Sequence, residues 1–215
     1  MGADMGFYSN WILPWICDRE LSDPALHSIR RDVLRDVSGC VLEVGFGSGS
    51  NLPFYPADVR RLVVVEPSAG MSRLASKRIA EWGGEIESHR LEGERLPFED
   101  ASFDSVVITL TLCSVRDPAR VLTEIRRVLR PGGGYHFLEH VASSKPRDCA
   151  WQRRLNGLNA ALGGGCQLLR DSERAIAEAG FMFERIERGI LPGGGIIPRW
   201  LFPVVWGKAL APAER

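Results

Sequence analysis

The sequence predicts an α/β protein in which helices cover both faces of a doubly wound, mostly parallel sheet. Short apolar runs of strand length alternate along the chain with amphipathic stretches of helix length, which is the pattern of βαβ units. The apolar run at 40–44 leads directly into a glycine-rich turn. The 215 residues are 45% hydrophobic and 25% charged, which suffices for one buried core without disulfides or a structural metal.

The apolar runs give six or seven strands. In chain order the predicted strands are 40–44, 62–65, 86–91, 103–112, 135–139, 183–187 and 203–207. The valine-rich runs at 40–44 and 62–65 are typical of strands that are buried on both faces. We therefore expect these two strands near the centre of the sheet.

Helix signals fill the first intervals between strands. Pro53 suits a first helical turn, with Asn51 as its cap. Ser68 is placed to cap a longer helix, and Gly83 is placed to end it. These signals predict two helices on the first half of the sheet.

The second half of the chain is less regular. Asp117 followed by proline predicts a helix whose last turns carry Arg126, Arg127 and Arg130, ending at the glycines of 131–134. The stretch 143–170 is an irregular helical insertion, interrupted at 163–165. A helix at 172–180 and a glycine- and proline-rich connection at 191–198 complete the pattern.

Charge and cysteine content exclude some classes of function. With 27 basic and 27 acidic residues the formal net charge is zero, so no global field attracts nucleic acid or an anionic membrane. The five cysteines are odd in number and show neither C-x-x-C nor zinc-ligand spacing. We expect reduced thiols, no metal site and a cytoplasmic protein. The cysteines are Cys17, Cys40, Cys113, Cys149 and Cys166.

The amino-terminal segment raises the question of a membrane. Asp4 stands where a secretory signal would carry positive charge, and the apolar stretch from Phe7 to Cys17 is short and interrupted by Pro14. The sequence therefore predicts no bilayer-spanning segment. Docking on a membrane surface stays open beside the interpretation of a helix packed on its own domain.

The central motif runs from Val41 to Gly49, a strand that passes directly into G-x-G-x-G. Glycine suits this turn because it adopts positive φ and lets a nucleoside approach the backbone. The third glycine of the dinucleotide fingerprint would fall at Ser50, so the spacing disfavours a nicotinamide cofactor. A tight turn without a ligand is the other interpretation.

Glu66 follows the second strand, 17 residues after Gly49. Nucleotide-binding α/β folds place an acid at this point to accept hydrogen bonds from ribose hydroxyls. An acid at a strand end can equally be a solvated surface residue. The glycine turn that precedes it favours the ribose contact.

Five motifs in order resemble the class I S-adenosylmethionine-dependent methyltransferases with a type 11 methyltransferase domain. They read VLEVGFGSG at 41–49, VVVEP at 63–67, EGERLPF at 92–98, SFDSVV at 102–107 and VLRPGG at 128–133. The resemblance covers residues 38–142. It implies a Rossmann-like sheet of seven strands, with the last strand antiparallel.

Further stretches are similar to the methyltransferase-like seven group of thiol methyltransferases. They are NLPFYP at 51–56, TLCSV at 111–115, LEHV at 138–141 and GGC at 164–166, before Arg170 and Asp171. The ubiquinone and menaquinone biosynthesis methyltransferases are the next resemblance. The implied reaction transfers a methyl group to a small molecule, most readily a thiol, and releases S-adenosylhomocysteine.

The resemblance also implies a role for each matching residue. The cofactor-binding positions are Glu43, Gly45, Gly47, Gly49, Asn51, Glu66, Pro67, Met71, Glu92, Gly93, Glu94, Thr109, Leu110 and Cys113. The three glycines would line the methionine moiety and Glu43 would face its ammonium group. Glu92 replaces the usual aspartate at the adenine amino group. Thr109, Leu110 and Cys113 would border the transferred methyl group.

His140 is the candidate catalytic base, because it lies just beyond the fifth strand at the carboxyl edge of the sheet. An ordinary hydrogen-bonded histidine is the alternative. Cys113 as a nucleophile is disfavoured, since an in-line methyl transfer needs no covalent intermediate. Tyr8, Trp11, Trp15 and Trp151 would either cover the pocket or pack on the sheet.

We therefore expect one methyltransferase domain over residues 1–215. Its parts are amino-terminal cap helices at 1–37, a cofactor-binding core at 38–142, and an insertion with the carboxyl-terminal half of the sheet at 143–215. The alternatives are a methyltransferase of a quinone precursor or lipid headgroup, a non-catalytic cofactor-binding module, and a nicotinamide oxidoreductase. The sequence does not indicate an oligomeric state.

Overall fold

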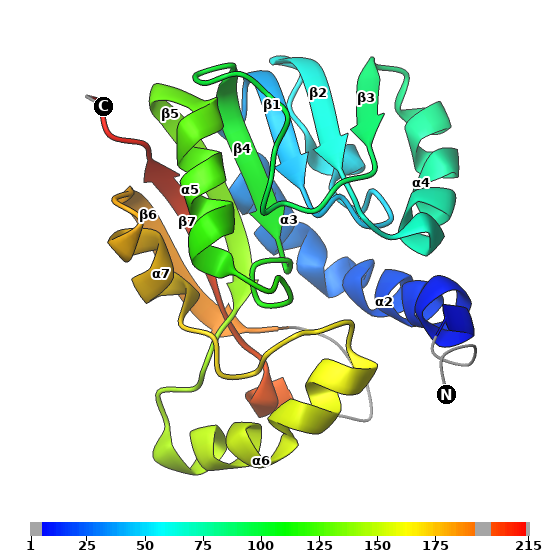
Figure 1. Cartoon of the computed structure of the whole chain (residues 1–215), viewed down its shortest axis with the longest axis vertical. Coiled ribbons are helices and arrows are strands. Elements are labelled where there is room, and N and C mark those ends of the chain that lie inside the picture. Colours follow the sequence, from blue (N-terminus) through cyan, green and yellow to red (C-terminus); the bar gives the residue numbers. More distant parts are fainter. Residues whose placement is uncertain (1–5, 192–198, 214–215) are drawn as a thin grey trace.

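The computed structural model describes residues 6–191 and 199–213 of the chain. Seven strands form one sheet in the order β3-β2-β1-β4-β5-β7-β6 (Figure 1). Their bounds are β1 Gly39–Val44, β2 Val59–Val65, β3 Ile86–His89, β4 Phe103–Thr109, β5 Leu129–His140, β6 Met182–Ile190 and β7 Pro203–Leu210. Each predicted strand is present.

Strand pairing confirms the predicted topology. The first five strands are parallel, with β1 between β2 and β4 at the centre of that half. The last strand, β7, pairs antiparallel with both β5 and β6. After β3 the chain crosses to the other side of β1 and forms β4, so the strand order reverses between β1 and β4. α/β proteins bind ligands at such a switch point, beyond the carboxyl ends of the strands.

Helices and short helical turns lie around this sheet (Figure 1). Their bounds are η1 Tyr8–Ile12, α2 Leu13–Leu21, η2 Pro24–Leu26, α3 His27–Leu34, η3 Leu52–Phe54, α4 Ala69–Trp82, α5 Pro118–Val128, α6 Pro146–Leu162, α7 Ser172–Glu178 and η4 Arg199–Leu201. The helices α5 and α7 pack on one face of the sheet, whereas α3, η3 and α4 pack on the other. Alternate residues along each strand belong to two hydrophobic cores, one on each face of the sheet, because successive side chains point to opposite faces.

Several predicted helix boundaries are confirmed. The Ser68 hydroxyl accepts a hydrogen bond from the Met71 amide at 3.3 Å, and Gly83 ends α4 in the left-handed conformation. The Asp117 carboxylate accepts from the Arg120 amide at 3.0 Å at the start of α5. Local capping chemistry thus sets these ends.

Three local predictions were wrong. Helix α5 ends at Val128, because the buried Leu129 is already extended and pairs with β4, so Arg130 lies in strand β5. The fourth strand ends at Thr109 rather than at residue 112, because Leu110 adopts a positive φ of 53°. Asn51 does not cap a helix, since its side chain bonds elsewhere and only the turn η3 forms. The connection predicted at 191–198 lies, from residue 192 onward, outside the described residues.

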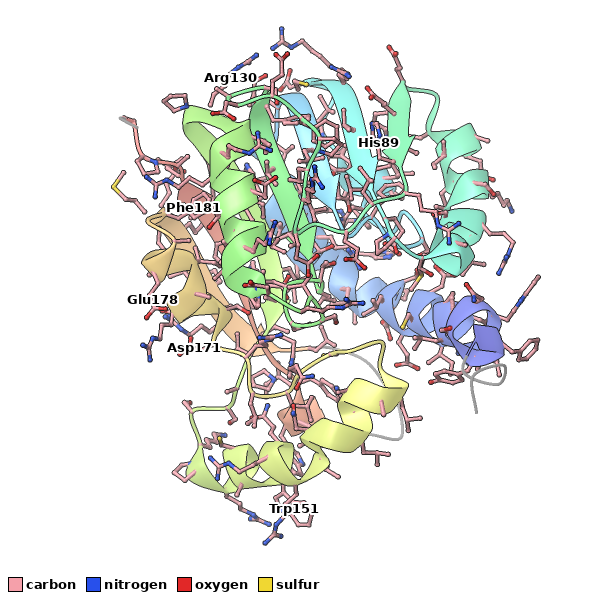
Figure 2. The ribbon with its side chains drawn as sticks, viewed as in Figure 1. His89, Arg130, Trp151, Asp171, Glu178 and Phe181 are labelled. Atoms are coloured by element: carbon pink, nitrogen blue, oxygen red, sulfur yellow. The ribbon has the colours of Figure 1, made fainter. Side chains whose placement is uncertain are left out.

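The helices α2 and α6 lie at the carboxyl end of the parallel strands (Figure 1). The tryptophans of η1, α2 and α6 do not pack on the sheet, because their side chains are exposed, and their place over the pocket stays a prediction. Trp11 is 57% exposed, Trp15 58% and Trp151 42%. Figure 2 shows Trp151 pointing away from the sheet. Over the described residues, the structure contains no helix that is both long enough and apolar enough to cross a membrane.

Candidate active site

The glycine turn after β1 has the backbone that the motif predicts. Gly45, Gly47 and Gly49 adopt φ values of 77°, 58° and 79°. A β-carbon at Gly45 would collide with the Thr111 side chain, so this position requires glycine for space as well as for conformation. Near Gly47 a β-carbon would meet only backbone at 4.0 Å, so this glycine leaves the turn open to a ligand.

Glu66 joins this turn to the next helix. Its Oε2 accepts a hydrogen bond from the Gly47 amide at 2.8 Å, and its Oε1 accepts from the Ser68 amide at 2.8 Å. Burial raises the pKa of Glu66, although the two backbone hydrogen bonds oppose the rise. Each carboxylate oxygen can accept a further bond, as a ribose diol requires.

Glu43, on β1, is the most enclosed acid of this edge. The Tyr55 hydroxyl donates to its Oε2 at 2.6 Å and the Asn51 amide donates to its Oε1 at 2.7 Å. Burial raises the pKa of Glu43 to about 7. The nearby charge of Arg30 lowers this pKa less than burial raises it, and no ion pair with Glu43 forms among the described residues, so the site suits an ammonium group.

Arg30 extends this network from α3. Its guanidinium donates to Asn51 Oδ1 and, at 2.8 Å, to the Leu21 carbonyl. Asn51 Nδ2 also approaches Thr109 Oγ1 at 3.1 Å. Asn51 therefore connects a buried arginine to the buried Glu43.

Helix α2 lies across the glycine turn and leaves a cavity of about 40 Å³ there, with room for only a few water molecules. The lining residues are Cys17, Asp18, Leu21, Arg30, Glu43, Gly45, Phe46, Gly47, Ser48, Ser50, Asn51, Met71 and Thr109. Arg78 holds α2 in place by bonding Asp18 Oδ1 at 2.7 Å and the Ser48 carbonyl at 2.8 Å. A nucleoside-sized ligand can enter this space only if α2 shifts.

The predicted cofactor positions fall into two groups. Six of them line this cavity, namely Glu43, Gly45, Gly47, Asn51, Met71 and Thr109. The others, Gly49, Glu66, Pro67, Glu92, Gly93, Glu94, Leu110 and Cys113, do not line it. Among these, Glu66 adjoins the cavity through Gly47. Glu92 is exposed and lies 3.9 Å from Arg116.

The end of β5 holds a second buried acid. Glu139 is fully buried, and its carboxylate accepts from the amides of Thr111, Leu112 and Cys113 at 3.0, 2.9 and 3.1 Å. Burial raises the pKa of Glu139 to about 7, against the effect of these hydrogen bonds. The acid therefore fixes the loop that follows β4.

His140 lies next to Glu139 in the chain and is only 2% exposed. Its Nε2 lies 3.1 Å from the Leu201 carbonyl. A carbonyl only accepts hydrogen bonds, so Nε2 carries the proton and the Nδ1 lone pair is free to accept one. Nδ1 has no hydrogen-bonded nitrogen or oxygen partner among the described residues.

The Cys166 thiol adjoins both His140 and the Cys113 thiol. The hydrogen bond with the Cys113 thiol, and after it the neighbouring His140, lower the pKa of Cys166 to about 5, against the effect of burial. The same thiol pair raises the pKa of Cys113 well above its usual value. The backbone supports this contact, because the Gln167 amide donates to the Cys113 carbonyl at 2.9 Å.

Four residues of these sites were missed as functional candidates. Arg30, Tyr55, Glu139 and Cys166 become visible only when the fold brings distant segments together. Tyr55 and Cys166 stood in the motif stretches but carried no predicted role. The only local signal for Glu139 was its position beside His140 at a strand end.

Comparisons with known proteins agree with this geometry. The methyltransferase domain family matches residues 42–137. Human thiol S-methyltransferase TMT1A is 39% identical over 150 residues, an alignment that covers 66% of this chain and 59% of the human protein. Human thiol S-methyltransferase TMT1B is 33% identical over 209 residues, covering 88% of this chain and 81% of the human protein.

A solved structure shares the fold at low identity. Geranyl diphosphate C-methyltransferase from Streptomyces coelicolor A3(2), in complex with S-adenosyl-L-homocysteine, superimposes with a TM-score of 0.65. That match has 16% identity and covers 86% of this chain and 78% of that chain. Together the matches show an enzyme that uses S-adenosylmethionine. The chain belongs to the S-adenosylmethionine-dependent methyltransferases, in the family that includes the mammalian thiol S-methyltransferases TMT1A and TMT1B.

Proposed function

We propose that this methyltransferase transfers the methyl group to the sulfur of a small thiol. The observation that carries the proposal is the contact of Cys166 with His140 and Cys113 at the carboxyl ends of β4 and β5. This contact supports the proposal, because a proton-accepting group is needed where the acceptor is expected to approach. Relatives that are 33% and 39% identical to this chain are thiol S-methyltransferases, which supports the same acceptor.

The residues around the glycine turn fit the methyl donor, which supplies an electrophilic methyl group when bound. Glu43 would hold its ammonium group and Glu66 its ribose diol, both consistent with the raised pKa of each buried acid. The remaining proposed donor contacts are Gly45, Gly47, Gly49, Asn51, Pro67, Met71, Glu92, Gly93, Glu94, Thr109, Leu110 and Cys113. Residues 38–142 would thus bind the donor, and the two flanking segments would select the acceptor.

The proton of the acceptor thiol would leave through two side chains. As the acceptor sulfur bonds the methyl carbon, its proton passes to Cys166 Sγ. Because its lowered pKa leaves Cys166 as a thiolate before the reaction, this proton is the one that then passes on to His140 Nδ1. The electron pair of the broken carbon–sulfur bond would stay on the donor. His140 is too buried to meet the acceptor itself. It therefore acts through Cys166, and the Leu201 carbonyl keeps Nδ1 free to accept.

No covalent intermediate on the protein is required by this route. Holding the acceptor in line with the sulfur–methyl bond can contribute about 7–11 kcal/mol to lowering the barrier. A small thiol, with an ordinary pKa of about 8.5, needs only a modest proton acceptor near pH 7. A reducing, cytoplasmic location would keep the site's own thiols available, and a nucleic-acid acceptor is not part of the proposal.

An acceptor panel tests the assignment. Production of S-adenosylhomocysteine is measured with small alkyl thiols, quinols, phenols and primary amines at equal concentration. We expect turnover with thiols and release of the S-methyl thioether. Turnover confined to quinols, phenols or amines would overturn the thiol assignment.

A variant pair tests the proton route separately. His140→Gln is expected to lower turnover with thiols by roughly 10²–10⁴-fold, the usual contribution of a positioned proton acceptor. Its affinity for S-adenosylhomocysteine should stay unchanged, because His140 does not line the donor cavity. Cys149→Ser, on α6, is the matched control and should behave as the wild type. Equal turnover of His140→Gln and the control would remove His140 from the route.

A further inference from the structure

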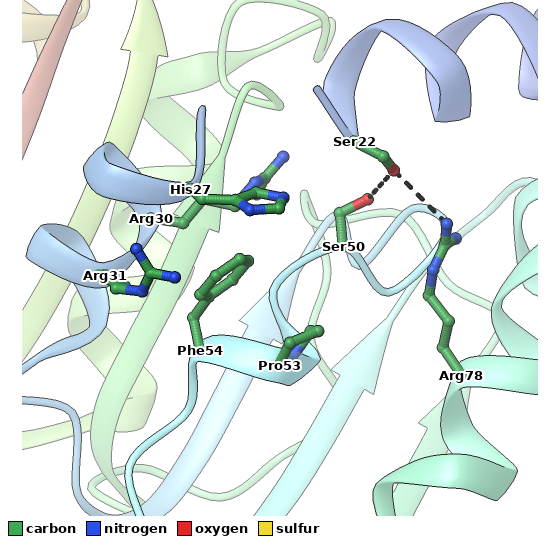
Figure 3. A pocket seen from close by; sticks show the side chains of 8 residues that line it. All are labelled: Ser22, His27, Arg30, Arg31, Ser50, Pro53, Phe54 and Arg78. Carbon is green, nitrogen blue, oxygen red and sulfur yellow. Dashed lines mark hydrogen bonds between the residues drawn. The ribbon is translucent and has the colours of Figure 1, made fainter. Parts of the chain in front are cut away.

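A second, larger cavity adjoins the cavity at the glycine turn, and Arg30 and Ser50 line both. Its volume is about 410 Å³, which is in the range of pockets for small organic ligands. It is lined by Ser22, His27, Arg30, Arg31, Ser50, Pro53, Phe54 and Arg78. Figure 3 shows His27, Arg31 and Phe54 on one side of it and Ser22, Ser50 and Arg78 on the other.

The charged side chains that line this cavity are all basic. Three guanidinium groups and an imidazole line it, and no carboxylate is among the described lining residues. Arg78 is paired with Asp18 at 2.7 Å, but over the described part of the chain Arg30 and Arg31 have no carboxylate within ion-pair distance. Arg31 therefore faces the cavity without an ion-pair partner, whereas Arg30 has only the more distant charge of Glu43, to which Asn51 connects it.

The burial of Arg30 makes this excess of positive charge energetically unfavourable. It is only 3% exposed, and its hydrogen-bond acceptors are the neutral oxygens of Asn51 and Leu21. Its Nε is buried and has no hydrogen-bond partner among the described residues. A buried guanidinium is stable when an anion accepts its remaining hydrogen bonds. An anionic ligand in the adjoining cavity would supply that partner.

Phe54 gives the cavity an apolar wall. The His27 ring lies 5.0 Å from the Phe54 ring, and the Arg31 guanidinium lies 5.6 Å from the same ring. His27, Arg30 and Arg31 share one side of α3, because residues three and four apart on a helix are neighbours. The cavity thus combines a cluster of positive charge with an aromatic surface.

We propose that this cavity binds a small organic phosphate at a site separate from the methyl-donor site. The phosphate group would lie against Arg30, Arg31 and His27, and the organic part would lie against Phe54 and Pro53. Guanidinium groups suit phosphate because their planar donors match its oxygens in pairs. The volume exceeds that of a phosphate group alone, which is why the ligand includes an organic part.

Calorimetry with phenyl phosphate tests the proposal. Wild-type protein is titrated at constant ionic strength, and we expect saturable binding to one site. Arg31→Ala and His27→Ala should each weaken binding at least fivefold. Neither side chain is buried, so these variants leave the buried Arg30 in place. Arg153→Ala, an exposed arginine of α6, is the matched control and should bind as the wild type.

The same titration in saturating S-adenosylhomocysteine separates this site from the donor site. Retained phenyl phosphate binding is expected, because His27, Arg31 and Phe54 line only the larger cavity, although Arg30 and Ser50 line both. Complete competition by S-adenosylhomocysteine would overturn the proposal, since the anion site would then be part of the donor site. Absence of binding by the wild type, or unchanged binding by Arg31→Ala, would also overturn it. Vesicles containing phosphatidate, added as a competitor, distinguish a lipid source of the phosphate from a soluble one.

Discussion

Two buried glutamates at neighbouring strand ends share a pKa raised to about 7 by burial, yet their surroundings differ. Glu43, on β1, is bonded by the side chains of Asn51 and Tyr55. Glu139, on β5, is bonded by three consecutive backbone amides of the loop after β4. Side chains can rearrange around a ligand, whereas a backbone loop that depends on one acid cannot do so without unfolding.

The difference assigns separate tasks to the two acids. Glu43 faces the donor cavity and is available for an ammonium group. Glu139 does not line that cavity and holds Cys113 in position beside Cys166. Substitution of Glu43 should therefore affect ligand binding most, and substitution of Glu139 should affect stability most.

The largest effect is expected for Glu139→Ala. Three buried amides lose their acceptor, and an unsatisfied buried donor costs about 1–3 kcal/mol. A loss of about 3 kcal/mol in the free energy of unfolding would lower the melting temperature by roughly 6–12 °C. Thermal unfolding by circular dichroism measures it. A variant that melts as the wild type would show that the loop is held by other contacts.

A smaller effect, on binding, is expected for Glu43→Gln. Removing the charge should weaken S-adenosylhomocysteine binding by about 1–3 kcal/mol, through loss of a charge-assisted hydrogen bond to its ammonium group. The melting temperature should change little, because glutamine keeps an acceptor for Asn51. Calorimetry and thermal unfolding on the same sample compare the two quantities. Unchanged affinity would remove Glu43 from the donor site.

The raised pKa of Glu43 also predicts a pH dependence. Below pH 7 the protonated acid must lose its proton to bind the ammonium group, so the dissociation constant should rise about tenfold per pH unit between pH 6 and 5. Glu43→Gln should flatten this profile. The effect on stability has the opposite sign, because an acid whose folded pKa is raised stabilises the fold less as pH rises from about 4.5 to 7. Equal profiles for the two proteins would contradict the assignment.

The smallest effect is expected at the contact between α2 and α4. Asp18 and Arg78 are partly exposed, and such pairs contribute at most about 1 kcal/mol. Asp18→Asn should therefore speed the association of S-adenosylhomocysteine a few-fold by loosening α2 over the glycine turn. Stopped-flow fluorescence of Trp15 in α2 and Trp11 in η1 follows the rate. An unchanged rate would show that α2 does not limit entry.

The same comparison explains what the sequence could predict. The glycine turn, Glu43 and Glu66 lie in one continuous motif region, and their chemistry depends on local backbone, so the strands were predicted correctly and the donor-binding residues could be proposed from the sequence. Cys113, His140, Cys166 and Leu201 meet only through the fold, and nothing in their spacing pairs them. The interpretation of Asn51 as a helix cap was wrong for the same reason, because a buried acid from another element attracts its side chain.

The central claim is that Cys166, at the carboxyl ends of β4 and β5, accepts the proton of an attacking thiol. It is tested most directly by kcat/KM for one small alkyl thiol from pH 5.5 to 9.5, measured for the wild type and for Cys166→Ser. The account predicts that the wild type stays active below the thiol's own pKa of about 8.5, whereas activity of the variant rises only as the free thiol ionises. Superimposable profiles for the two proteins would contradict it.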